Sequence, residues 1–340
     1  MDDSRIQKLA RLLDWPCLID QTADLLYLTG LSLSKGRLLV VPHRESILLV
    51  DGRYYDIAKK KAPCSVLLWD EQKKWLEKQI SFDSANVTYE SYLTLKKTFP
   101  AAEFVPKPNP VKELRMRKEP KEIASLKKAA AVTWRGYQRL LEELRVGVSE
   151  EELSWEFEFF CRKNGASGLS FEPIIAFGEN SAYPHYRAGK SRLKEGQVVL
   201  VDIGAIVEQY HADMTRIVHF GKPDERILRF EKLVSQAKHQ AISHIKPGIR
   251  VGFLDQIVQD EFDRTNVKPL YTHSLGHGIG LETHEFPRLR FDGEDKDVIL
   301  KPGMVFTIEP GLYQPGVGGV RLEDMIVVTE TGFENLFESC

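Results

Sequence analysis

Apolar residues in the first third of the chain come in short runs that are separated by turn-forming residues. Runs of strand length occupy 17–19, 38–41 and 47–50, and a helix is expected around 5–13. Gly, Pro and Asp residues between the runs indicate turns. This pattern predicts an α/β layer.

The spacing of apolar residues changes to three and four after Pro120, which is typical of helices with one buried face. The predicted helices cover 122–144, 150–163, 224–245 and 253–266. Ser149 with Glu152 three residues later forms a capping-box pattern that begins the second of these helices, and Gly147 ends the first. Strand-like runs are expected at 174–177, 198–207, 212–220, 304–309 and 320–329. This part of the chain is therefore predicted to be a sheet decorated by helices.

A cluster of prolines divides these two patterns. Prolines occur at positions 100, 106, 108, 110 and 120, and proline favours extended connectors because it lacks a backbone donor. A length of 340 residues also suggests two domains. We expect an N-terminal domain at 1–110, a linker at 111–120 and a second domain at 121–340.

Composition excludes several classes of protein. Lys plus Arg number 47 against 49 for Asp plus Glu, so a nucleic acid or an anionic membrane is not expected as a partner. The start of the chain, 1–5, lacks the pattern of a secretory signal, and no apolar run is long enough to span a membrane, which favours a cytoplasmic protein. The four cysteines lie far apart, which argues against a zinc knuckle or a disulfide framework.

Two aspartates within apolar strand-like segments, Asp202 and Asp213, are the first candidates for chemistry. An unpaired charge there would cost several kcal/mol or would take up a proton. A hairpin centred between Val207 and Glu208 would place the two carboxylates directly opposite each other on one face. Such a pair repels unless a proton or a cation lies between the carboxylates.

A second pair of acids, Glu309 and Glu323, flanks a segment at 311–319 that is expected to be a flexible loop, and His277 lies in a Gly-rich segment at 273–280. Each residue alone is more often structural than functional. Together, four carboxylates and one imidazole favour divalent cations, with Mn²⁺ ahead of Zn²⁺ or Co²⁺. Four negative charges would balance two such ions.

The segments around these residues resemble the creatinase and prolidase group of pita-bread metallopeptidases, peptidase family M24. The matching segments are Asp202-Ile-Gly-Ala, Ala212-Asp213-Met-Thr-Arg216, Gly276-His277-Gly-Ile-Gly280-Leu-Glu-Thr-His284-Glu285, Thr307-Ile-Glu309-Pro-Gly-Leu-Tyr and Gly319-Val-Arg321-Leu-Glu323-Asp324. The similarity runs from about Glu119 onward. Near the N-terminus, the segments at 24–30 and 51–54 are similar to the creatinase-type N-terminal domain, although Asp24 stands where the family often has Asn.

The resemblance implies a fold and a set of site residues. The fold would be α/β, with a creatinase-like N-terminal domain before a pita-bread α+β catalytic domain. The implied metal ligands are Asp202, Asp213, His277, Glu309 and Glu323, with Asp202 and Glu323 shared between two divalent ions. The implied catalytic residues are His185, His284 and Glu309, and the implied substrate-binding residues are His273 and Arg321.

The implied activity is hydrolysis of the Xaa-Pro bond at the N-terminus of proline-containing peptides, as by aminopeptidase P. The alternative is an Xaa-Pro dipeptidase, or prolidase, which acts on dipeptides. A metal-free binding module or a creatinase-type C–N hydrolase is disfavoured, because such relatives generally lack the ligand set. A homodimer is expected only by analogy with the family.

Overall fold

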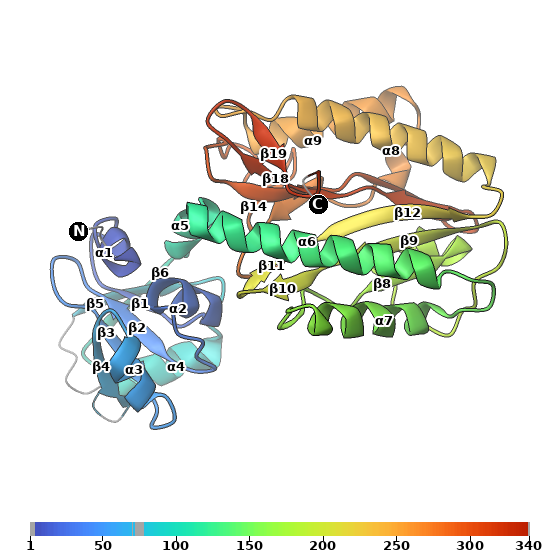
Figure 1. The fold of residues 1–340 in the computed structure, drawn as a ribbon. Helices are drawn as coiled ribbons and strands as arrows, with labels where there is room; N and C mark the ends of the chain where they lie inside the picture. Colours follow the sequence, from blue (N-terminus) through green and yellow to red (C-terminus); the bar gives the residue numbers. More distant parts are fainter. Residues whose placement is uncertain (1–3, 70, 72–77, 339–340) are drawn as a thin grey trace. The chain divides into compact units, whose positions relative to one another are not determined.

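The chain forms two compact units, residues 1–115 and 116–340 (Figure 1). A computed structural model describes residues 4–69, 71 and 78–338. The expected linker at 111–120 contains the helix α5 (Val111–Met116) and the first residue of the next helix, and the exact domain boundaries stay a prediction. In the described part of the chain, no helix has both the length and the hydrophobicity of a membrane span.

The first unit is built on a mixed six-stranded sheet with the strand order β4-β3-β2-β1-β5-β6. Its elements are α1 (Arg5–Ala10), β1 (Cys17–Ile19), α2 (Thr22–Thr29), β2 (Arg37–Val40), β3 (Ile47–Val50), α3 (Tyr55–Lys61), β4 (Ser65–Leu68), β5 (Gln79–Asp83), α4 (Tyr89–Thr98), β6 (Glu103–Lys107) and α5. Strand β1 is antiparallel to β2 and parallel to β5. Leu18, Leu39 and Leu49 from the central strands are buried in its core. This is the α/β layer that the apolar runs predict.

Asp24 on α2 is a buried ion-pair partner within the first unit. Its side chain accepts hydrogen bonds from Arg115 Nη1 at 2.8 Å and from Asn109 Nδ2 at 2.7 Å. Because Asp24 is only 1% exposed, its charge depends on these partners. In this unit, Asp24 therefore connects α2 with the segment that leads into α5.

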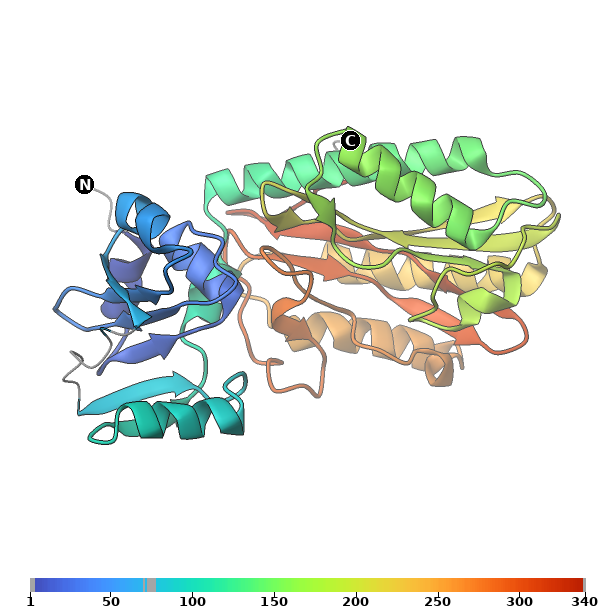
Figure 2. The same ribbon diagram turned by 90° about the horizontal axis from the view of Figure 1, so that it is seen from below.

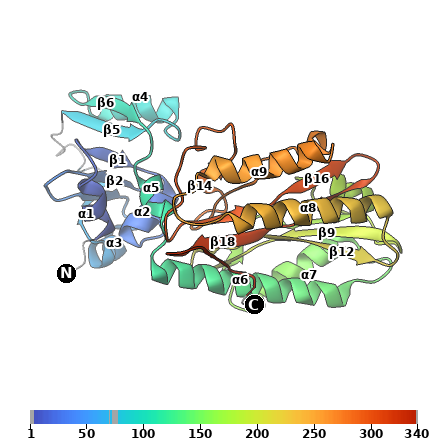
Figure 3. The same cartoon turned by 90° about the horizontal axis from the view of Figure 1, so that it is seen from above.

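Two pairs of helices enclose the strands of the second unit. The helices are α6 (Pro120–Glu143), α7 (Glu150–Lys163), α8 (Glu225–Ser243) and α9 (Val251–Arg264). Figure 2 shows α6 and α7 on one side of the strands and α8 and α9 on the other, and Figure 3 shows α8 and α9 side by side. One apolar core includes Leu126 and Phe157 from the first pair, and the other includes Val234 and Leu254 from the second. The predicted capping box of Ser149 and Glu152 is confirmed.

The strands among the described residues of the second unit form four small sheets. The strands are β7 (Gly168–Leu169), β8 (Ile174–Phe177), β9 (Gln197–Ile203), β10 (Ala205–Val207), β11 (Tyr210–His211), β12 (Met214–Phe220), β13 (Gly276–Gly278), β14 (Glu285–Leu289), β15 (Val305–Ile308), β16 (Gly311–Gln314), β17 (Gly318–Arg321), β18 (Asp324–Val328) and β19 (Phe333–Asn335). The sheet orders are β11-β10-β7, β12-β9-β8, β14-β13-β15-β18-β19 and β16-β17. Short 3₁₀ helices cover Gly178–Ala182 (η2) and Lys268–Leu270 (η3).

The register of β9 and β12 differs from the one predicted. Asp202 lies opposite Thr215 and not opposite Asp213, so the predicted direct pair is wrong. The turn is centred one residue later, because Glu208 and Gln209 both adopt positive φ angles of 50° and 72°. That change moves each cross-strand partner by two residues, which preserves the face on which every side chain lies.

The segment at 311–319 is not the flexible loop expected from its glycines. Strands β16 and β17 pair as an antiparallel hairpin there, with Leu312 opposite Val320. The expected single strand at 320–329 is divided into β17 and β18 by Leu322 and Glu323. In this break, the Glu323 backbone N–H donates to the Thr215 carbonyl at 3.1 Å, which links Glu323 to β12.

Candidate active site

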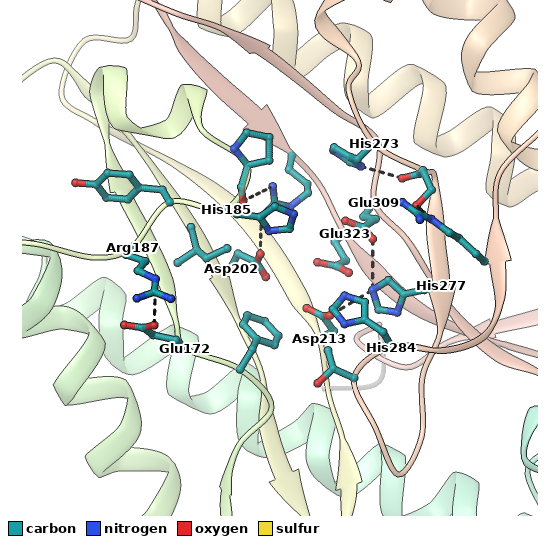
Figure 4. Close-up of a pocket in the computed structure, with 18 of the residues that line it drawn as sticks. Glu172, His185, Arg187, Asp202, Asp213, His273, His277, His284, Glu309 and Glu323 are labelled. Carbon is teal, nitrogen blue, oxygen red and sulfur yellow. Dashed lines mark hydrogen bonds and ion pairs between the residues drawn. The ribbon is translucent and has the colours of Figure 1, made fainter. Parts of the chain in front are cut away.

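Five predicted ligand residues occupy strands or the breaks beside strands in the second unit. Asp202 lies on β9 and His277 on β13, whereas Asp213 precedes β12, Glu309 follows β15, and Glu323 separates β17 from β18. Figure 4 shows their side chains directed toward one region between the two groups of strands. Segments far apart in the sequence thus contribute to one cluster.

Most of these side chains lie within a few ångströms of one another. Ligand atoms of Asp213, His277 and Glu323 all lie within 4.8 Å of one another. His277 Nε2 is 3.7 Å from Asp213 Oδ2 and 3.4 Å from Glu309 Oε1. Asp202 joins the cluster through Arg321, whose Nη2 donates to Asp202 Oδ2. The role of these residues as metal ligands stays a prediction.

Burial and mutual repulsion disfavour the negative charge of this cluster. Burial, followed by the charge of Glu323, raises the pKa of both Asp213 and Glu309 well above its usual value. Burial and the neighbouring Asp202 raise the pKa of Glu323 to about 7. The carboxylates therefore need a positive counter-charge to ionise together at neutral pH.

The donor set fits divalent cations. Within the described residues, Asp202 Oδ1 and Glu323 Oε1 are buried without a hydrogen-bond partner, and buried oxygens rarely remain unsatisfied. The His277 Nδ1 lies 3.0 Å from the Gly278 carbonyl, which holds the proton on Nδ1 and leaves a lone pair on Nε2 toward the acids. Burial and His284 lower the pKa of His277 to about 3, so the imidazole is neutral. A neutral imidazole and oxygen donors suit a divalent ion.

A cavity of about 540 Å³ opens onto the cluster. All three predicted histidines outside the ligand set line it: His185, His273 and His284. The ring centroids of His277 and His284 are 4.3 Å apart. Burial, followed by His185 and Arg288, lowers the pKa of His284 and keeps this ring neutral at neutral pH. The predicted catalytic residues therefore border the space where a substrate would lie.

Arg321 and His273, both predicted to bind substrate, are joined to each other through Tyr313, and Arg321 contacts Asp202 directly. Arg321 Nη1 donates to the Tyr313 hydroxyl at 2.7 Å, and His273 Nε2 lies 2.9 Å from the same oxygen. Arg321 Nε also donates to Thr215 Oγ1, which in turn donates to Glu323. Arg321 is only 3% exposed. Its hydrogen bonds therefore orient Asp202 and Glu323, and direct contact with a substrate stays a prediction.

Tyr313 was not singled out in the sequence as a site residue. It ends the segment Thr307–Tyr313, but a lone tyrosine in an apolar strand carries no spacing or charge signal. Burial raises the pKa of its hydroxyl to about 12, so the hydroxyl keeps its proton. The contact between Tyr313 and Arg321 becomes visible only in the structure, where β16 pairs with β17 and Gly311 lies opposite Arg321.

Two segments of the chain match known families. Residues 124–330 match metallopeptidase family M24, and residues 6–117 match the creatinase/prolidase N-terminal domain. The chain belongs to metallopeptidase family M24. This M24 chain is therefore a peptidase, and the predicted family and two-part α/β fold are confirmed.

Relatives of this M24 peptidase match it along nearly its whole length. An Xaa-Pro dipeptidase from Pyrococcus horikoshii is 33% identical over 324 residues, which are 94% of this chain and 91% of that protein. The prolidase structure from Pyrococcus horikoshii has a TM-score of 0.93 at 32% identity and 98% coverage of both chains. An X-Pro aminopeptidase structure from Thermotoga maritima has a TM-score of 0.85 at 30% identity and 97% coverage of both chains.

A buried ion pair supports the loop of the M24 peptidase that carries His284. Lys118 Nζ lies 3.1 Å from Glu285 Oε2, and the two side chains are 2% and 4% exposed. The other oxygen of Glu285 accepts a hydrogen bond from the Glu282 backbone at 3.1 Å. Lys118 carries no signal of this role in the sequence, because it lies within a basic stretch, 115–118, that resembles solvated surface.

Proposed function

We propose that the chain is an Xaa-Pro dipeptidase that uses two divalent metal ions, with Mn²⁺ favoured by the oxygen-rich donor set. The observation that carries the proposal is the buried cluster of carboxylates and one neutral imidazole on the wall of a cavity. The names of the relatives support dipeptides over longer peptides, which favours the alternative and not the aminopeptidase P-like activity expected first.

Asp202, Asp213, His277, Glu309 and Glu323 would hold the ions. Bound divalent cations supply positive charge that polarises the scissile carbonyl and lowers the pKa of water. The same charge would offset the burial and the mutual repulsion that raise the pKa of Asp213 and Glu309. The cavity volume of about 540 Å³ lies within the range of ~300–1,000 Å³ that is usual for small-ligand sites.

The protein's own groups would move the proton and stabilise charge. Glu309 would accept a proton from the attacking water and pass it to the proline nitrogen. A neutral His284 would donate a hydrogen bond to the oxyanion that develops on the carbonyl. His185 would hold the substrate from the other side of the cavity. Proline in the leaving position has no amide N–H. Binding of an Xaa-Pro substrate therefore does not depend on a hydrogen bond donated by that nitrogen.

Dipeptide selectivity would require a cation for the terminal carboxylate. Arg288 lines the cavity beside the histidines, and its Nε lies 3.2 Å from Ser274 Oγ. Arg187 also lines the cavity, but it is 84% exposed and faces Glu172 at 3.7 Å. We assign the carboxylate to Arg288, because the nearby His273 and His284 are neutral and the guanidinium of Arg321, which also lines the cavity, is already paired with Asp202.

The first experiment compares one Xaa-Pro dipeptide with one Xaa-Pro-Xaa tripeptide, using purified protein with and without added Mn²⁺. We expect metal-dependent cleavage of the dipeptide and at least about tenfold lower kcat/KM for the tripeptide. Asp213→Asn and His277→Ala should stay folded by circular dichroism but lose bound metal and activity. Full turnover by either variant would exclude these ligand assignments, and a preferred tripeptide would restore the aminopeptidase interpretation.

The second experiment tests Arg288. Arg288→Met should raise KM for a dipeptide by about 10- to 100-fold and should have no such effect on the C-terminally amidated dipeptide, which lacks the carboxylate. Arg187→Met is the matched control and should change KM little. An equal effect of Arg288→Met on both substrates would contradict the assignment.

A further inference from the structure

The loop that carries His185 has no strand partner along its length. It occupies 178–189 of the connection between β8 and β9, and within these residues the short helix η2 is the one regular element. His185, Tyr186 and Arg187 from this loop line the cavity. Something other than a sheet must therefore fix the position of the His185 backbone.

A fully buried carboxylate lies at the base of this loop. Glu150, the first residue of α7, is 0% exposed. Its Oε1 accepts hydrogen bonds from the Phe177 backbone at 2.9 Å and from Asn180 Nδ2 at 2.8 Å. Its Oε2 accepts from the Tyr186 hydroxyl at 2.8 Å and from the Gly189 backbone at 3.2 Å. One donor is the last residue of β8, and the other three come from the loop, including Gly189 at its end.

Capping of α7 does not require Glu150. Ser149 and Glu152 already form the complete capping box of this helix. The four donors to Glu150 are all neutral, and burying a carboxylate among neutral groups costs several kcal/mol unless every lone pair is satisfied. The helix N-terminus contributes further stabilisation. The position of Glu150 therefore serves the loop and not the helix.

The loop is also held from the side of the acidic cluster. Arg321 Nη1 approaches the carbonyl of Pro184, the residue before His185, at 3.5 Å. The Gly319 backbone donates to Ser181 Oγ at 2.8 Å. The loop is thus fixed between Glu150 on one side and β17 on the other, with His185 between the two anchors.

We propose that Glu150 is a positioning residue for the reaction: its carboxylate fixes the loop so that His185 stays at the cavity wall. The proposal rests on the proposed function only in taking His185 as a group that contacts the substrate. The fixed loop itself is a property of the protein without substrate or metal, and it can be measured separately.

The test is a double-mutant cycle of Glu150→Gln with His185→Ala. Glu150→Gln keeps the size of the side chain but sets an amide N–H₂ against a backbone N–H, that of Phe177 or that of Gly189, depending on the orientation of the amide. We expect kcat/KM to fall by up to about 100-fold, the size of effect that follows a displacement near 1 Å, with bound metal unchanged. In the His185→Ala background the same change should have almost no further effect. Amide hydrogen exchange should rise across 178–189 in the metal-free protein.

Glu151→Gln is the matched control, since it removes a negative charge from the same helical turn without touching the loop side chains. Equal losses from Glu150→Gln in both backgrounds, or unchanged exchange at 178–189, would overturn the proposal.

If His185→Ala is fully active, the role of His185 in the proposed function fails, while hydrogen exchange still decides whether Glu150 fixes the loop. If Glu150→Gln does not fold, Asn180→Ala weakens the same network, and the same two criteria apply to it.

Discussion

The Tyr313 hydroxyl joins two groups that face the cavity, since it accepts a hydrogen bond from Arg321 and lies beside His273 Nε2. Arg321 in turn donates to Asp202, a predicted ligand. The neutral Tyr313 hydroxyl therefore orients the Arg321 guanidinium, which in turn is the ion-pair partner of Asp202. Residues of this kind usually affect metal affinity and rate nearly as strongly as the ligands do.

Tyr313→Phe should lower kcat/KM or metal affinity by about 10- to 100-fold, because Arg321 Nη1 loses its acceptor while the aromatic packing is kept. Steady-state kinetics on an Xaa-Pro dipeptide, together with metal titration, would measure the change. Tyr183→Phe is the control, since Tyr183 is 57% exposed. Equal activities of the two variants would show that the hydroxyl does not orient Arg321.

At the scale of elements, the segment before α6 is held to the loop of His284 by the pair of Lys118 and Glu285. Lys118→Met should lower the free energy of unfolding by about 3–5 kcal/mol, because Glu285 would remain buried without its partner. Urea denaturation would measure this change. Lys121→Met is the control, because Lys121 is 77% exposed and should cost less than about 1 kcal/mol. Similar midpoints for both variants would contradict the prediction.

The contact of β13 with β15 leaves no room for a side chain at Gly276. A Cβ atom there would lie 2.0 Å from the Thr307 carbonyl oxygen. Gly276→Ala should therefore displace β13, move His277 away from Glu309 and reduce bound metal. Gly332→Ala is the control, because a Cβ atom there meets nothing within 4 Å. Metal analysis of both purified variants would test this, and a full metal content in Gly276→Ala would contradict it.

Helices and buried strands were the elements that the sequence predicted best. The predicted bounds of α7 and β8 agree with the structure, because a capping box and a short apolar run between turns are local signals. The β9–β12 register was wrong, since the turn at Glu208 and Gln209 lacks glycine. The β16–β17 hairpin was missed because its glycines resemble a loop.

The residues of the candidate site also divide into those with a local signal in the sequence and those whose role depends on distant partners. Acids within apolar segments indicated Asp202, Asp213, Glu309 and Glu323, and a Gly-rich segment indicated His277, whereas the family resemblance supplied His185, His284, His273 and Arg321. Glu150, Lys118 and Tyr313 could not be found in this way. Their significance depends on partners that lie far away in the sequence, such as Tyr186 for Glu150 and Glu285 for Lys118.

At the scale of the whole molecule, all the predicted ligands belong to the unit at 116–340. A divalent ion that binds only the folded state should therefore stabilise that unit, by about 2.7 kcal/mol at a concentration 100 times the dissociation constant. Hydrogen-exchange mass spectrometry with and without Mn²⁺ should show added protection in peptides from β9, β13 and β18. Asp213→Asn is the control and should show none. Equal protection in the strands of the first unit would contradict this prediction.

Glu323 lies between β17 and β18, close to the last strand in the sequence, and this position has a consequence for biosynthesis. Asp202 is synthesised long before Glu323, and the acids meet only after β17 and β18 have joined the earlier strands. Under the proposed ligand assignment, a nascent polypeptide on the ribosome would carry no hydrolytic centre until almost all of the unit at 116–340 has emerged. Premature termination before Glu323 would yield an inert fragment and not a truncated but active enzyme.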